Sequence, residues 1–143
     1  MSADERALCI LCRVGGERVA VRTEDVQKVV SLAQLSRLPR LPAVVAGIAH
    51  HRGRMITIVH AATLLFDAPA QVKPGDLRAL LLDRPARNLA LLVDAVDGIE
   101  LLRLPPDLKH GPGPGLRVAE HRGGAILAVD VEQAYQRFLA VAG

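Results

Sequence analysis

The sequence HRGRMITIVHAATLL, from His51 to Leu65, returns in altered form as HRGGAILAVDVEQAY, from His121 to Tyr135. Both stretches open on the same three residues and continue with an alternation of apolar residues that favours β-strands. Glycine at the third position accepts the positive φ that a tight turn requires. This repetition therefore predicts two related β-hairpins within one chain.

The two stretches lie 70 positions apart (121 − 51), and the same offset aligns most of both halves without a gap. VAVRTEDVQKVV then lies over LALLVDAVDGIE, and CILC lies over ALLL. Coincidence among common aliphatic residues is the alternative explanation. We interpret the offset as an internal duplication, and because two copies are too few for a solenoid, we expect two small β units that share one core.

Short strands bounded by turn residues are expected throughout each copy. In the first copy we predict strands at residues 7–14, 18–22, 29–32, 47–51 and 54–59, with a helical turn capped by Thr23. In the second copy we predict strands at 78–83, 89–93, 99–102, 116–120 and 125–129, then an amphipathic helix at 131–142. Residues 84–88 read as a turn, 67–76 as a linker and 105–115, rich in Pro and Gly, as an irregular loop.

Five strands per copy favour a small curled barrel, because closure removes exposed strand edges. The sequence therefore predicts an all-β fold of two five-stranded barrels related by an internal pseudo-repeat. The barrels are expected at residues 7–66 and 77–138 of a single domain spanning residues 1–143. Short helices, including one at the C-terminus, complete the prediction.

Composition narrows the function classes. The formal net charge is only +3, and three aromatic residues in 143 are too few for the stacking platforms of sheets that bind single-stranded nucleic acid. A basic barrel that binds nucleic acid therefore remains a minor alternative, and we expect no nucleic-acid partner. Acidic residues precede the first apolar segment and no apolar run reaches membrane-spanning length, so we expect a cytoplasmic protein without membrane insertion.

Two sets of residues are candidates for a metal site or a redox site. His50, His51 and His60 offer imidazole ligands for zinc, which makes a small metal-dependent enzyme the competing hypothesis. Adjacent residues of a strand, however, point to opposite faces, so His50 and His51 are poorly placed to share one ion. Cys9 and Cys12 form a CxxC motif within an apolar strand, where residues three apart again face opposite sides, so we expect buried or edge thiols rather than redox or metal chemistry.

Taken in order along residues 7–139, these elements resemble the CheW-like chemotaxis coupling domain. The resemblance rests on Gly47, on the Arg52-Gly53 turn with the strand at 55–59, and on the VDAV of residues 93–96. It implies two five-stranded barrels resembling SH3 domains and an adaptor without catalysis or cofactors. It also implies two partners, the regulatory domain of a CheA-type chemotaxis histidine kinase and the cytoplasmic helices of chemoreceptors.

The turn at Arg52 is the candidate protein-binding site. A guanidinium presents five donors in a fork that suits carboxylates on a partner helix, and apolar neighbours could form the centre of an interface. Lys28 stands where the resemblance leads us to expect a glutamate. The residues expected to bind a protein partner are Arg52, Gly53, Lys28, His51, Val30, Leu38 and Ile48.

Overall fold

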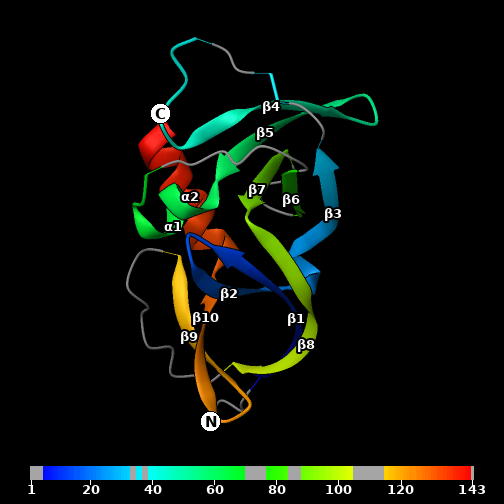
Figure 1. The fold of residues 1–143 in the computed structure, drawn as a ribbon, viewed down its shortest axis with the longest axis vertical. Helices are drawn as coiled ribbons and strands as arrows, with labels where there is room; N and C mark the ends of the chain where they lie inside the picture. The colour runs from blue at the N-terminus through cyan, green and yellow to red at the C-terminus, as the bar shows by residue number, and fades with distance from the viewer. Residues whose placement is uncertain are drawn as a thin grey trace.

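The computed structural model describes residues 5–32, 35–36, 39–69, 77–83, 88–104 and 115–142. Within these ranges the chain forms mostly β-strands, with two α-helices and one 3-10 turn (Figure 1). The strands are β1 (Glu5–Val14), β2 (Glu17–Arg22), β3 (Val26–Leu32), β4 (Val45–His51), β5 (Arg54–His60), β6 (Leu77–Leu82), β7 (Leu89–Val93), β8 (Ala95–Leu104), β9 (Leu116–His121) and β10 (Gly124–Val129). The helical elements are η1 (Thr23–Asp25), α1 (Ala61–Phe66) and α2 (Val131–Ala142).

Two five-stranded sheets lie one above the other in Figure 1. The lower sheet is a closed barrel in the order β1-β2-β10-β9-β8, and β8 returns to pair with β1. The upper sheet has the order β3-β6-β7-β5-β4, and in the described ranges β3 and β4 form its two ends. The mostly β fold with five strands per sheet and a C-terminal helix agrees with the sequence prediction, but only one of the two expected closed barrels is found.

The internal repeat is confirmed element by element. An offset of 70 residues relates β1 to β6, β2 to β7, β3 to β8, β4 to β9, β5 to β10 and α1 to α2. Strand registers obey the same offset: Leu11 pairs with Gly98 between β1 and β8, and Leu81 pairs with Lys28 between β6 and β3. Even the β-bulges correspond, because the register skips Asp97 in β8 and Gln27 in β3. The two copies therefore share backbone geometry as well as residues.

The division into barrels at residues 7–66 and 77–138 is wrong, because each sheet draws strands from both copies. The barrel combines β1 and β2 with β8, β9 and β10, and the upper sheet combines β3, β4 and β5 with β6 and β7. Since β3 and β8 are equivalent, pairing within a copy and pairing between copies satisfy the same register. The chain passes from β2 of the barrel to β3 of the upper sheet through the three-residue η1, and Val26 is already extended at φ −121° and ψ 124°. The result is an exchange of strands like that of swapped dimers, but inside one chain.

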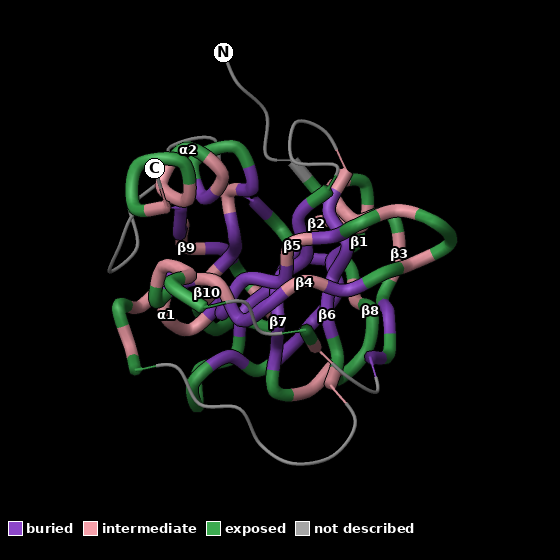
Figure 2. Tube along the Cα trace, turned by 90° about the horizontal axis from the view of Figure 1, so that it is seen from above, coloured by how far each residue is buried: buried purple, intermediate pink, exposed green. Residues whose placement is uncertain are grey.

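The core is built from aliphatic side chains in three clusters. One fills the barrel, one lines the upper sheet, and the largest lies between the two sheets under α1 and α2. Every residue of β7 is buried, and Figure 2 shows the buried trace running through the centre of the molecule. The three aromatic residues, Phe66, Tyr135 and Phe138, are partly buried against the cluster between the sheets. Burial of this aliphatic surface supplies the main stabilisation of the fold.

Most local expectations agree with the structure, and two do not. The residues of α1 were not predicted to be helical, and Thr23 lies inside η1 rather than capping it, with no side-chain cap hydrogen bond. The expected turn at 84–88, linker at 67–76 and loop at 105–115 lie largely outside the described residues. Neither α-helix of the described ranges is long and apolar enough to cross a membrane.

Candidate protein-binding site

The two HRG turns have the same backbone. Arg52 and Gly53 join β4 to β5 with φ of 50° and 77°, and Arg122 and Gly123 join β9 to β10 with φ of 51° and 78°. Two consecutive positive φ values match the right-handed twist of a hairpin, which is why glycine is required at the second position. The two hairpins point away from each other in Figure 1, toward the side and toward the bottom. The molecule therefore presents two copies of one turn in different surroundings.

The second-copy turn is held by a carboxylate of its own chain. Glu100 of β8 places Oε1 2.7 Å from a terminal nitrogen of Arg122 and Oε2 3.0 Å from Nε2 of His121. The His121 contact has the distance of an ion pair, although its geometry falls outside that of a hydrogen bond. His121, helped by Arg122 and opposed by burial, lowers the pKa of Glu100 below its ordinary value. The electrostatic contact with Glu100 therefore holds the turn against β8, and we call this contact the latch.

The first-copy turn lacks that latch. Val30 occupies the position of Glu100, and it offers no polar atom. In the part of the chain that the structure describes, the buried Nε2 of His51 has no hydrogen-bond partner. Arg52 is exposed, and no ion pair is recorded for it within those ranges. The Arg52 guanidinium and the His51 imidazole of this turn therefore have no acid partner among the described residues.

Positive charge gathers around this turn. Burial, and then the charges of Lys28, Arg52 and Arg54, lower the pKa of His51 below its ordinary 6.5. Figure 1 shows β3, which carries Lys28, rising toward the β4–β5 hairpin, so the upper sheet curves enough to bring its two ends near each other. Arg54 is turned toward Asn88, to whose Oδ1 it donates a hydrogen bond of 2.6 Å. We call Lys28, His51, Arg52 and Arg54 the cationic turn.

The structure separates the remaining candidate residues. Val30 is only 4% exposed and belongs to the core of the upper sheet, so its assignment to the contact surface is corrected: the rest of the sheet covers it. Ile48 is half-buried, and its backbone exchanges two hydrogen bonds of 3.0 Å with Ser36. Gly53 is exposed beside Arg52. Leu38 lies outside the described residues.

Sequence reasoning missed Glu100, although the signal was present. The 70-residue offset places Glu100 over Val30, and a charged residue over an aliphatic one is the most informative kind of mismatch between copies. The similarities between the two copies point to the HRG sequence that both contain. The differences between the copies identify which of the two turns has an acid of its own chain beside it.

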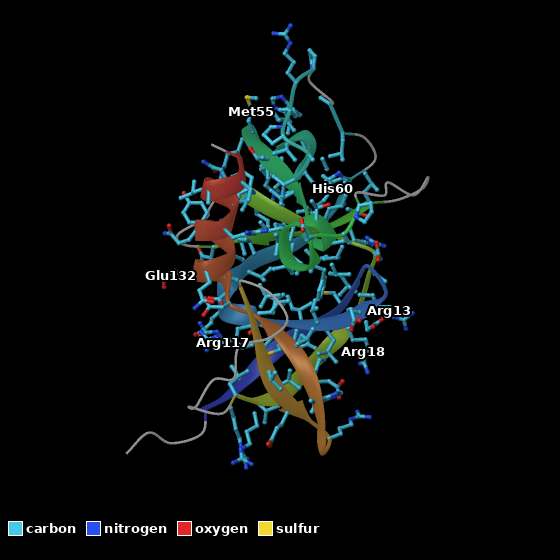
Figure 3. The ribbon with its side chains drawn as sticks, turned by 90° about the vertical axis from the view of Figure 1, so that its left-hand side faces the viewer. Arg13, Arg18, Met55, His60, Arg117 and Glu132 are labelled. Carbon is cyan, nitrogen blue, oxygen red and sulfur yellow. The ribbon has the colours of Figure 1, made fainter. Side chains whose placement is uncertain are left out.

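The three histidines of the metal hypothesis do not converge. His50 is exposed, His51 lies half-buried at the end of β4, and His60 is buried at the far end of β5. Six residues of strand separate His60 from the turn, which is about 20 Å. Figure 3 shows His60 well separated along β5 from Met55, the cross-strand partner of His50. In the described ranges no group of three or more His, Cys, Asp or Glu could hold a metal ion.

The CxxC thiols face different cores, as expected. Cys9 belongs to the cluster inside the barrel, and Cys12 belongs to the cluster between the sheets. Both are fully buried and free. Burial, with smaller contributions from Asp97 and Asp94, raises the pKa of the Cys12 thiol to about 12. The pair therefore packs as apolar side chains and is unsuited to dithiol chemistry.

Fold and site together define a duplicated β domain that presents a cationic hairpin turn to solvent. The model of the CheW-like domain matches residues 8–133, so the chain belongs to the CheW-like domain family. Among solved structures, the fold is similar to the crystal structure of the scaffolding protein TtCheW from Thermoanaerobacter tengcongensis. The TM-score is 0.70 at 19% identity, over 87% of this chain and 89% of that chain. No curated protein matches the sequence.

Proposed function

We propose that the protein is a non-enzymatic adaptor of a chemosensory pathway, which couples chemoreceptors to a CheA-type histidine kinase through protein–protein contacts. Membership of the CheW-like domain family across residues 8–133 carries the proposal, because members of this family act as adaptors rather than enzymes. The similarity to a scaffolding protein over most of both chains agrees with it. Its mechanism is affinity and geometry, and its expected place of action is the cytoplasm.

The contact surface of the proposal is the cationic turn. Arg52 is exposed at the hairpin turn, and the ion pairs among the described residues do not involve it, so its guanidinium can form charge-assisted hydrogen bonds with a partner. Lys28 and His51 extend the surface, with Gly53 at its tip and Ile48 along its flank. The kinase regulatory domain and the receptor helices are the proposed partners, and a patch of one charge would also steer an acidic partner toward it.

The test compares Arg52→Ala with Arg122→Ala, the same substitution in the same turn of the other copy. Partners are first recovered by co-purification from native cells and identified by mass spectrometry, and binding to each is then measured by calorimetry. Loss of a charge-assisted hydrogen bond is expected to cost about 1.5–3 kcal/mol, or at least tenfold in affinity. Thermal unfolding of Arg52→Ala should stay close to that of the wild type because the side chain is exposed.

Arg122→Ala is the matched control, because Arg122 is already paired with Glu100 and should leave partner affinity nearly unchanged. Recovery of no kinase or receptor from cells would contradict the adaptor role itself. Equal affinity of the wild type and Arg52→Ala would instead remove Arg52 from the contact surface.

A further inference from the structure

The two HRG turns form an internal comparison, because they share their three residues but not their neighbours. Val30 of the first copy corresponds to Glu100 of the second, Lys28 to Gly98 and Arg54 to Gly124. Both place a histidine, an arginine and a glycine on the same backbone, at the same register of equivalent hairpins. In the second copy the carboxylate of Glu100 contacts both cationic side chains, at 3.0 Å and 2.7 Å. In the first copy the equivalent strand position is Val30. The second copy therefore displays what an occupied turn looks like, and the first copy displays the same turn without its acid.

Two observations identify the missing group as an anion. In the described ranges the Nε2 atoms of His51 and His121 are both buried without a hydrogen-bond partner, and an unsatisfied buried polar atom is costly. The Nε2 of His121 has a carboxylate oxygen of Glu100 3.0 Å away, whereas the structure shows no acid at that distance from His51 within those ranges. The charges of Lys28, Arg52 and Arg54 all act on His51, and each disfavours a second cation there. A carboxylate can contact the imidazole and the guanidinium together, as Glu100 does in the other copy at 3.0 Å and 2.7 Å.

We infer that the first-copy turn is a carboxylate-binding site, which takes a glutamate or aspartate side chain of a partner protein beside Arg52 and His51, as Glu100 lies beside Arg122 and His121 in the second copy. Arg52 meets the acid at the surface, and a rotation of the half-buried imidazole of His51 brings its Nε2 to the same acid. The origin of the carboxylate in a partner rests on the proposed adaptor function, but the site itself rests on the comparison of the two turns.

Binding at this site is coupled to protonation of His51. In the free protein, burial and the cationic groups that face it from β3, the turn and β5 keep its pKa below 6.5. A bound carboxylate favours the imidazolium and raises that pKa, so binding takes up a proton. Affinity should therefore increase as the pH falls from 7 through the pKa of the bound state, and level off below the pKa of the free state.

The experiment follows the imidazole signals of His51 and His121 by NMR in the full chain, with sodium acetate as the probe. The pH titration is recorded in acetate and in sodium chloride of the same ionic strength. Acetate is expected to raise the titration midpoint of His51 and to leave that of His121 unchanged, because Glu100 already occupies the second turn. Equal responses of the two histidines, or no response of His51, would overturn the inference.

Two substitutions test the inference from both sides: one adds an acid beside the first turn, and the other removes the acid beside the second turn. Val30→Glu supplies the acid internally, so it should raise the midpoint of His51 and abolish its response to acetate. Glu100→Val empties the second turn, so it should create a response of the His121 imidazole signals to acetate. Val30 is buried, so the Val30→Glu protein is at risk of not folding. In that case the test uses Glu100→Val alone. A folded Glu100→Val whose His121 ignores acetate would contradict the inference.

Failure of this inference and failure of the proposed function are distinguishable. If acetate acts at His51 but Arg52→Ala leaves partner binding unchanged, the carboxylate site stands and the adaptor surface lies elsewhere. If Arg52→Ala weakens partner binding but acetate has no effect on His51, the adaptor function stands and the carboxylate site is disproved.

Discussion

At the residue scale, the carboxylate of Glu100 is one of the differences between the two turns, because Val30 stands at the equivalent position of the first copy. Glu100 is ionised more readily than an isolated glutamate because His121 and Arg122 stabilise its charge. In the first copy Val30 contributes to the aliphatic core, while the histidine and arginine above it have no acid partner among the residues that the structure describes. The same motif is thus held by a carboxylate of its own chain in one copy and, within the described ranges, by none in the other.

The latch at Glu100 predicts a pH-dependent contribution to stability. Its pKa in the folded protein lies below the ordinary 4.5, so the contribution is complete above that value and is lost as the pH falls through the folded pKa. We expect Glu100→Gln to lower the free energy of unfolding at pH 7 and to differ less from the wild type at pH 3. Urea unfolding of both proteins at the two pH values measures this, and a constant difference would exclude the latch as its source.

Burial of Cys12 predicts that its thiol reacts slowly with alkylating reagents. Its pKa of about 12 leaves almost no thiolate at pH 8, and the side chain is inaccessible. Iodoacetamide at pH 8 should therefore label the native chain far more slowly than the chain in 6 M guanidinium chloride, and mass spectrometry of the digested protein reports each cysteine separately. Rapid native labelling of Cys12 would indicate that the strand β1 opens readily.

The two helices show how equivalent elements diverge at the element scale. At the start of α2, Asp130 accepts a hydrogen bond of 3.1 Å from the backbone N–H of Gln133 and an ion pair of 2.6 Å from Arg117. Burial raises the pKa of Asp130, but these two partners outweigh it and leave the pKa below its ordinary value. The equivalent residue of α1 is His60, which makes no side-chain cap hydrogen bond. The capped helix extends over 12 residues and the uncapped helix over 6.

Asp130→Ala should therefore destabilise the protein by about 1–2 kcal/mol through loss of the N-cap, with a further contribution from the unpaired Arg117. Thermal and urea unfolding measure the change, and circular dichroism reports whether α2 frays. Gln136→Ala, an exposed position of the same helix, is the control and should leave stability nearly unchanged. Equal effects of the two substitutions would argue against a cap at Asp130.

At the scale of the whole molecule, exchange of strands makes each sheet depend on both copies. The barrel needs β8, β9 and β10 from the second copy, and the upper sheet needs β6 and β7 from it. Neither copy contains a complete sheet. The two halves are therefore one cooperative unit, in contrast to two barrels joined by a linker.

A chain cut between residues 69 and 77 tests this dependence. Fragments 1–69 and 77–143 should each be largely unfolded alone, because each would expose the edges of incomplete sheets. Expressed together, they should associate into a folded complex with the circular dichroism spectrum of the intact chain. Two fragments that each fold independently would restore the partition into residues 7–66 and 77–138.

Local elements were accessible from the sequence, because turn residues and apolar alternation act over a few neighbours. The hairpin at Arg52 and the helix at 131–142 follow from such patterns, and the 70-residue offset applied to that helix would also have located α1. Burial of Val30 was not accessible, because a valine on a half-buried strand reads equally well as core or as interface. The isolation of His51 required knowledge of which acid lies within reach, which is a matter of tertiary structure.

The sequence by itself determined that the chain is a doubled β domain of the CheW-like kind, since each copy repeats its expected strands and turns in the same order. Only the tertiary structure decided which copy supplies the partner of each strand. The physical reason is that equivalent strands offer equivalent registers, so alternation along the chain cannot distinguish pairing within a copy from pairing between copies. The same packing of strands places Glu100 beside the second HRG turn and Val30 beneath the first.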